Sequence, residues 1–194
     1  MTPESTNANN NDRRHEIRFA GSGGQGLQLS AKILAYALIG EGLYASQSQS
    51  YEPTSRGGLS RADLVIGPDE PDFPLATAAD FILLLDQVAA NDGAKIIKPG
   101  GTIITDQRLV PSPPNGDFRL LALPITDTAI AIGNPRIANV VALGVLNALA
   151  ALASREALEA AVGALTPAKF RELNLEALKA GYGMAEAETA ESAA

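Results

Sequence analysis

Four glycines within six residues mark the stretch of the sequence best suited to ligand chemistry, Gly21-Ser22-Gly23-Gly24-Gln25-Gly26. Alternating apolar residues over 17–19 predict a strand before it, and apolar residues at three- and four-residue steps over 27–38 predict a helix after it. Glycine lets a ligand approach the backbone closely, and free N–H groups at a helix start attract anions, phosphate above all. The stretch is therefore a candidate phosphate site, with a strand-to-helix turn that serves only packing as the alternative.

The spacing Gly21-x-Gly23-x-x-Gly26 also matches the form of a dinucleotide fingerprint. That fingerprint needs an acidic residue about 20 residues further on, at the end of the second strand, to hold a ribose hydroxyl. Glu41 lies near that distance, but it precedes Gly42 and the next apolar run, so it does not close a strand. A dinucleotide is therefore the less favoured of the phosphate-bearing ligands.

The loop over residues 50–61 is a second candidate site. In it Arg56 is followed directly by Gly57 and Gly58, and Arg61 closes the segment. A guanidinium beside backbone amides suits a carboxylate or a phosphate. A surface loop with solvated arginines is the more common explanation of such a segment taken alone.

Two predicted strands end in aspartates, Asp86 and Asp106. The carboxyl ends of parallel strands form the ligand crevice of an open sheet. Strand-end aspartates are more often caps of the following helix or turn, and this is the favoured interpretation.

Composition limits the kinds of protein that this chain can be. It has 194 residues, 46% of them apolar, which suits one domain, and no apolar run reaches the length of a membrane span or resembles a signal segment. The absence of cysteine excludes disulfides and thiolate-ligated clusters, and the one histidine, His15, is expected to belong to the polar leader. A net charge of −7 argues against nucleic-acid binding. We expect a cytoplasmic chain that is not an enzyme alone.

The order of the segments predicts the fold. Residues 1–14 are expected to form a disordered leader, residues 15–183 one domain, and the Ala/Glu-rich residues 184–194 a frayed tail. Strands are expected at 17–19, 43–48, 62–67, 81–86, 102–106 and 120–124, with helices between and after them. This alternation predicts an α/β fold with a single open, mainly parallel twisted sheet, helices on both faces (Rossmann-like) and C-terminal helices. The helix expected at 137–149 is apolar on every side, which places it between the sheet and a partner surface.

Four separated segments together resemble the gamma subunit of thiamine-diphosphate-dependent 2-oxoacid:ferredoxin (acceptor) oxidoreductases. Residues 21–26 are similar to that family's G-x-G-G-Q-G, residues 50–58 to its S-Y-G-P-E-x-R-G-G and residues 139–144 to its N-M-x-A-L-G, and residues 169–181 match its closing helix. The resemblance covers residues 15–183. Glu52 and Thr54 stand where the family usually has glycine and glutamate, so the subgroup and its 2-oxoacid stay open.

The resemblance implies a subunit that docks on catalytic partners and is inactive alone. The complex would decarboxylate a 2-oxoacid, pass electrons to ferredoxin or another acceptor and form an acyl-CoA. Thiamine diphosphate, Mg²⁺ and iron–sulfur clusters would be held by the partner subunits, with no metal ligand or catalytic residue here.

The coenzyme A (CoA) contacts implied for this chain are Gly21, Ser22, Gly23, Gly24, Gln25, Gly26 and Arg56. Arg56 would bind a CoA phosphate or, by slight preference, a carboxylate of a neighbouring subunit. No nucleic acid and no membrane is expected as a partner. The alternatives are a purely structural subunit of the same complex and an autonomous NAD(P)-binding dehydrogenase domain.

Overall fold

A six-stranded open sheet runs through the structure, a computed structural model that describes residues 13–51 and 57–192. The strands are β1 (His15–Ser22), β2 (Tyr44–Tyr51), β3 (Leu59–Gly67), β4 (Ala79–Leu84), β5 (Ile97–Asp106) and β6 (Arg119–Leu123). They lie in the order β2-β3-β1-β4-β5-β6. β1, β4, β5 and β6 are parallel, whereas β3 is antiparallel to both of its neighbours. The predicted open, mainly parallel α/β sheet is confirmed, with one reversed strand that the pattern did not reveal.

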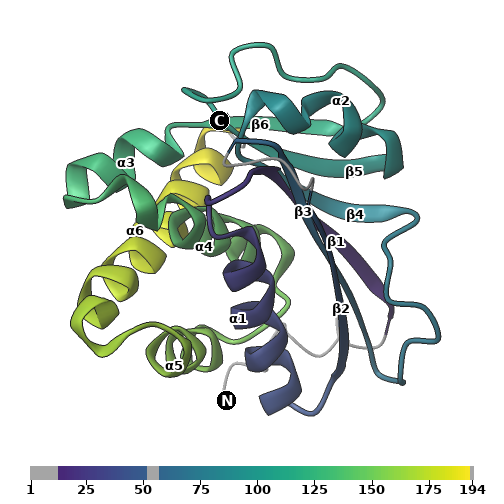
Figure 1. Ribbon diagram of the computed structural model, residues 1–194, viewed down its shortest axis with the longest axis horizontal. Helices are drawn as coiled ribbons and strands as arrows, with labels where there is room; N and C mark the ends of the chain where they lie inside the picture. The colour runs from purple at the N-terminus through teal and green to yellow at the C-terminus, as the bar shows by residue number, and fades with distance from the viewer. Residues whose placement is uncertain (1–12, 52–56, 193–194) are drawn as a thin grey trace.

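The two faces of the sheet carry unequal layers (Figure 1). The larger layer holds α1 (Leu27–Gly40), α3 (Ile125–Ile132), α4 (Ala138–Ala150), α5 (Arg155–Leu165) and α6 (Arg171–Ser192). In the described part of the chain, the other face carries α2 (Ala90–Gly93) between the short 3-10 turns Gln87–Ala89 and Ala94–Ile96 and no further helix. Each layer packs on its own apolar cluster, the larger one around Phe19 and Leu34 and the smaller one around Ile82 and Ala90. Helices on both faces and closing helices at the C-terminal end are as the sequence predicts.

The apolar helix α4 is covered by the chain itself. Val141 is fully buried, and α4 crosses α6 so closely that a Cβ added to Gly144 would collide with the carbonyl oxygen of Leu178. A Cβ added to Gly181 would collide with the carbonyl oxygen of Val141. The prediction that this helix is largely buried is confirmed. The choice of Val141 as a partner-facing position is wrong, because α6 of the same chain covers it.

Three further predictions concern the two ends of the chain and the loop after β2. Helix α6 continues to Ser192, and Ala185 within it is only 2% exposed, so residues 184–192 are helical rather than frayed. His15 is the first residue of β1 and is buried, so it belongs to the sheet and not to the leader. The predicted disorder of the leader falls mostly on residues 1–12, and Arg56 falls in 52–56, both outside the described residues.

Candidate functional site

The strand order creates a crevice at the carboxyl ends of β1 and β4. The chain leaves β1 toward β2 on one side and leaves β4 toward β5 on the other, so these parallel neighbours form the switch point at which open sheets bind ligands. A cavity of about 310 Å³ lies there. Its lining comes from the glycine turn, the ends of β4 and β5 and the start of α4: Gly24, Gln25, Leu85, Asp106, Leu109, Thr126, Pro135, Arg136, Ala138 and Asn139.

The side chain of Gln25 holds the glycine turn closed. Its Oε1 accepts a hydrogen bond from the N–H of Ser22 at 2.7 Å, and its Nε2 donates to the carbonyl of Leu85 at 2.9 Å. A Cβ on Gly21 would collide with the same Oε1. Gln25 and Gly21 therefore shape the turn and join it to the end of β4, a structural role that the sequence alone did not assign.

Gly24 and Gly26 of the turn differ in the space around their backbone. Gly26 has φ +78°, and a Cβ on it would lie 2.7 Å from Nδ2 of Asn139, which donates to the carbonyl of Gly26 at 3.2 Å. Gly24 has φ +100° with no atom within 4 Å of an added Cβ, and it lines the crevice. Gly26 is thus required for packing against α4, whereas Gly24 is open to a ligand.

The first turn of α1 makes this end of the crevice suitable for an anion. The first hydrogen bond into the helix runs from the N–H of Ser30 to the carbonyl of Gly26, at 3.0 Å. The N–H groups of residues 27–29 have no helical acceptor, as is general at helix starts, and they add to the positive end of the helix dipole. Arg136 is an exposed residue that lines the same cavity. The arrangement can hold a phosphate or a carboxylate.

The reversed strand β3 brings the second candidate loop to this turn. In the β1–β3 register Ser22 lies opposite Leu59, and the N–H of Gly23 donates to the carbonyl of Gly58 at 2.9 Å. Arg56 precedes Gly58 by two residues in the sequence. Arg61 lies within β3 and its Nη1 bonds Asp92 Oδ2 at 2.6 Å. The structure therefore joins the two motifs, but Arg56 lies outside its described residues.

Both strand-end aspartates are caps, as the favoured interpretation predicts. Asp86 accepts from the N–H of Val88 at 3.0 Å and caps the turn that leads into α2. Asp106 is 1% exposed, and its carboxylate accepts from three backbone N–H groups, those of Arg108, Leu109 and Thr126, at 2.7 to 2.9 Å. Asp106 lines the crevice, but its charge is already compensated by these donors.

Glu41 is not placed to hold a ribose. Its carboxylate accepts from the N–H of Ser154, at 3.1 and 3.3 Å, and so caps α5 at the far end of α1. In addition, β3 occupies the place beside β1 that the second strand takes in the dinucleotide fold, and β2 lies one strand further out. The geometry therefore lacks the ribose-binding half of a dinucleotide site.

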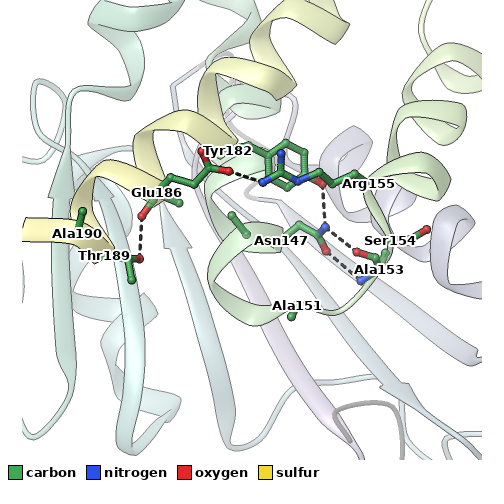
Figure 2. Close-up of a pocket in the computed structure, with 11 residues that line it drawn as sticks. Asn147, Ala151, Ala153, Ser154, Arg155, Tyr182, Glu186, Thr189 and Ala190 are labelled. Atoms are coloured by element: carbon green, nitrogen blue, oxygen red, sulfur yellow. Dashed lines mark hydrogen bonds and ion pairs between the residues drawn. The ribbon is translucent and has the colours of Figure 1, made fainter. Parts of the chain in front are cut away.

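A larger cavity of about 640 Å³ lies at the opposite end of α4 (Figure 2). There the amide of Asn147 accepts from the N–H of Ala153 at 3.0 Å and donates to its carbonyl and to the Tyr182 hydroxyl, both at 2.9 Å. The Arg155 guanidinium lies 4.3 Å from the centre of the Tyr182 ring and forms an ion pair with Glu186. Burial raises the pKa of Tyr182, against the opposing effects of the Asn147 hydrogen bond and the Arg155 charge. Because these polar groups bond one another, we interpret this cluster as the joint between α4, α5 and α6.

Two features are absent from residues 13–51 and 57–192. No three or more His, Cys, Asp or Glu residues there are grouped so that they could hold a metal ion. No helix there has both the length and the apolar character needed to span a membrane.

An open α/β sheet with a glycine turn at its switch point defines a Rossmann-like, ligand-binding class of domain. Residues 16–184 match the family described as pyruvate ferredoxin/flavodoxin oxidoreductase, and the chain belongs to that family. The 2-oxoglutarate synthase subunit KorC of Methanocaldococcus jannaschii is 37% identical over 176 residues, which are 89% of this chain and 94% of KorC.

Solved structures agree with this assignment. The gamma subunit of the keto/oxoacid ferredoxin oxidoreductase of Geobacter sulfurreducens has a TM-score of 0.80 and 39% identity, over 89% of this chain and 99% of that one. The 2-oxoglutarate:ferredoxin oxidoreductase of Magnetococcus marinus shares the fold, with a TM-score of 0.80 and 24% identity over 91% of this chain and 32% of that one. The predicted resemblance to the gamma subunits of 2-oxoacid oxidoreductases is confirmed.

Proposed function

We propose that this chain is the gamma subunit of a CoA-acylating 2-oxoglutarate:ferredoxin oxidoreductase complex, and that it helps to bind or cover CoA. The 2-oxoacid left open by the sequence is taken as 2-oxoglutarate because the KorC relative is named as a subunit of 2-oxoglutarate synthase. The complex would oxidatively decarboxylate 2-oxoglutarate and transfer the acyl group to CoA. The cytoplasmic location expected from the sequence is part of this proposal.

One observation carries the CoA assignment. Gly24 is the glycine of the turn that lines the crevice and has open space around it. It lies beside the N-terminal turn of α1, whose N–H groups suit a phosphate of CoA. A cavity of about 310 Å³ is at the lower end of the size range for small-molecule sites, so it would hold a phosphate-bearing part of CoA while other subunits cover the rest.

The loop after β2 is the second element of the proposed site. The Gly23–Gly58 hydrogen bond ties the end of this loop to the glycine turn, which supports a role for Arg56 at the same edge of the sheet. An arginine there would bind a CoA phosphate or a carboxylate of a neighbouring subunit. Gly21, Ser22, Gly23, Gln25 and Gly26 would act by shaping the turn.

The redox chemistry would be supplied by the partner subunits. In this proposal they hold thiamine diphosphate, Mg²⁺ and the iron–sulfur clusters, because the present chain contains no cysteine to ligate a cluster. This chain would contribute binding and positioning only.

Reconstitution with the catalytic subunits tests the proposal. We expect 2-oxoglutarate-dependent ferredoxin reduction with CoA only when the gamma chain is present with its partners, and no turnover by the isolated chain. Titration of the complex with CoA and with NAD should show CoA binding. Turnover of a 2-oxoacid by the isolated chain, or NAD binding in place of CoA, would contradict the proposal.

A purely structural subunit is the second candidate, since Gly21 and Gly26 are explained by packing alone. That reading predicts that CoA binds the complex equally well whatever residue occupies position 24.

A further inference from the structure

Among residues 13–51 and 57–192, no helix lies on the second face of one half of the sheet. The short helix α2 and its flanking turns pack on β1 and β4 through Ala20, Ile82 and Leu84, whereas all five longer helices lie on the other side (Figure 1). Over β2 and β3 this leaves a cavity of about 410 Å³, roofed in part by Phe73 and Leu75 from the β3–β4 connection. These two side chains are 48% and 45% exposed, which leaves an apolar rim beside the cavity.

Buried charge lies at the base of this cavity. Arg18, only 7% exposed, donates from Nε and Nη2 to the two oxygens of Asp63, at 2.7 and 2.8 Å. Asp63 Oδ2 also accepts from the N–H of Ala76 at 3.3 Å. The carboxylate is thus engaged by three donors, and the bonds to it use two of the Arg18 N–H groups. Arginine has five N–H donors and no acceptor, so the base of the cavity offers donors.

The walls of the cavity add donors of the same kind. Nη1 of Arg61 donates to Asp92. The Arg61 side chain lines the cavity and carries further guanidinium N–H groups. The hydroxyls of Ser48 and Ser50 line it too. The Asp63 and Asp92 carboxylates already accept hydrogen bonds from the two arginines. The groups of the cavity that are left to bond a ligand are therefore mainly hydrogen-bond donors. An ionised carboxylate, which only accepts hydrogen bonds, complements this set.

The adjacent strand β2 is an open edge of the sheet. It pairs only with β3 in the described structure, and its sequence over 44–51, Tyr-Ala-Ser-Gln-Ser-Gln-Ser-Tyr, contains neither a charge nor a proline. Edge strands are normally protected by charges, prolines or bulges. The opposite edge strand β6 is five residues long, begins with Arg119 and is followed by Pro124. The long unprotected edge at β2 is suited to pairing with another extended chain.

From these observations we propose that β2 and the cavity beside it dock an extended segment of a partner subunit, which adds a strand to the sheet and places an Asp or Glu side chain in the cavity that Arg61 and Arg18 line. This inference rests on the proposed function, because the partner is a subunit of the same complex. The register supports it: Ser50 lies opposite Arg61, so a residue beside Ser50 on an added strand is two strand spacings, about 10 Å, from Arg61. A glutamate at that place reaches into the cavity that the Arg61 side chain lines.

A matched pair of substitutions tests the carboxylate site in the reconstituted complex. Ser50→Glu puts a carboxylate beside Arg61, where it competes with and repels the partner's acid, and we expect the affinity for the catalytic subunits to fall by about tenfold or more. Gln49→Glu makes the same charge change on the opposite face of the same strand and should change the affinity by less than about threefold. Equal effects of the two substitutions would overturn the carboxylate site.

Hydrogen exchange tests the strand addition. Those amides of residues 44–51 that face away from β3 should exchange at least about tenfold more slowly in the complex than in the free chain, because pairing with the added strand protects them. An intact complex without this protection would overturn the inference and leave the proposed function standing. Protection that instead appears in the isolated chain as it dimerises would assign the edge to a second copy and also overturn it. Failure of the unmodified chain to assemble would overturn both proposals.

Discussion

At the residue scale, the glycine turn combines positions that serve packing with one that is open. Gly21 and Gly26 have neighbours that exclude a side chain, namely Gln25 and Asn139. Gly24 has none, yet its positive φ favours glycine. The same motif therefore supports both the structural and the ligand-binding reading, and substitution at Gly24 separates them.

We expect Gly24→Ala to raise the KM for CoA of the complex about tenfold, equivalent to about 1.4 kcal/mol, and to leave CoA-independent decarboxylation unchanged. Gly42→Ala is the matched control, because Gly42 has φ +89° and equally open surroundings but follows α1 at its far end. Both substitutions impose a similar backbone strain of about 1 kcal/mol. Steady-state kinetics with CoA varied measures the difference, and equal KM values for the two variants would favour the purely structural reading.

Ionisation of Tyr182 should lower the stability of the folded chain at alkaline pH. Burial raises its pKa in the folded state, so its contribution to stability is complete below the unfolded value of about 10 and declines as the pH rises through the folded value. The free energy of unfolding should fall more steeply above about pH 10 for the unmodified chain than for Tyr182→Phe, by up to about 1.4 kcal/mol per pH unit. Urea unfolding from pH 8 to 11 measures this, and the other tyrosines cancel in the comparison. A difference between the two proteins that does not vary with pH would refute the assignment.

At the scale of the elements, the α4–α6 crossing depends on two facing glycines. Gly144 lies against the backbone of Leu178 and Gly181, and Gly181 lies against the carbonyl of Val141. This close approach lets α6 cover the apolar helix α4.

Gly181→Ala should therefore destabilise the chain by about 3 kcal/mol, because the added methyl forces the helices apart. Gly183→Ala is the control in the same helix, since an added Cβ there meets no atom within 4 Å. It should be neutral or stabilising by up to about 1 kcal/mol through helix propensity. Chemical denaturation of both variants measures the contrast, and a cost at Gly181 no larger than at Gly183 would show that the crossing is loose.

At the scale of the whole molecule, the last turns of α6 belong to the fold. Ala185 is buried, Met184 packs against the main apolar cluster, and Glu186 pairs with Arg155 of α5. A chain ending at Gly183 should lose about 1–3 kcal/mol of stability through lost apolar burial. Removal of residues 193–194 alone is the control and should change nothing measurable. Thermal unfolding of both truncated chains decides this, and an unchanged midpoint for the longer truncation would mean that these turns contribute no stability.

The sequence by itself determined the local elements and the motifs. Periods of two and of three to four residues are local properties, so the six strands, the helices α1, α4 and α5 and the start of α6 could be predicted to within about five residues. The last turns of α6, which the sequence predicted to fray, were not. The capping roles of Asp86 and Asp106 were predictable for the same reason, because a cap bonds backbone groups within a few residues of itself or at the next helix start. The family resemblance also followed from short ordered motifs.

Only the tertiary structure decided which of these segments meet. The direction of β3 depends on long-range pairing, which periodicity does not encode, and that direction brings Gly58 to Gly23. The cover over α4, the burial of His15 and the capping of α5 by Glu41 are contacts between residues distant in sequence. The division of the glycine turn into packing positions and the open Gly24 depends on the same distant contacts, since Asn139 comes from α4 and Leu85 from the end of β4.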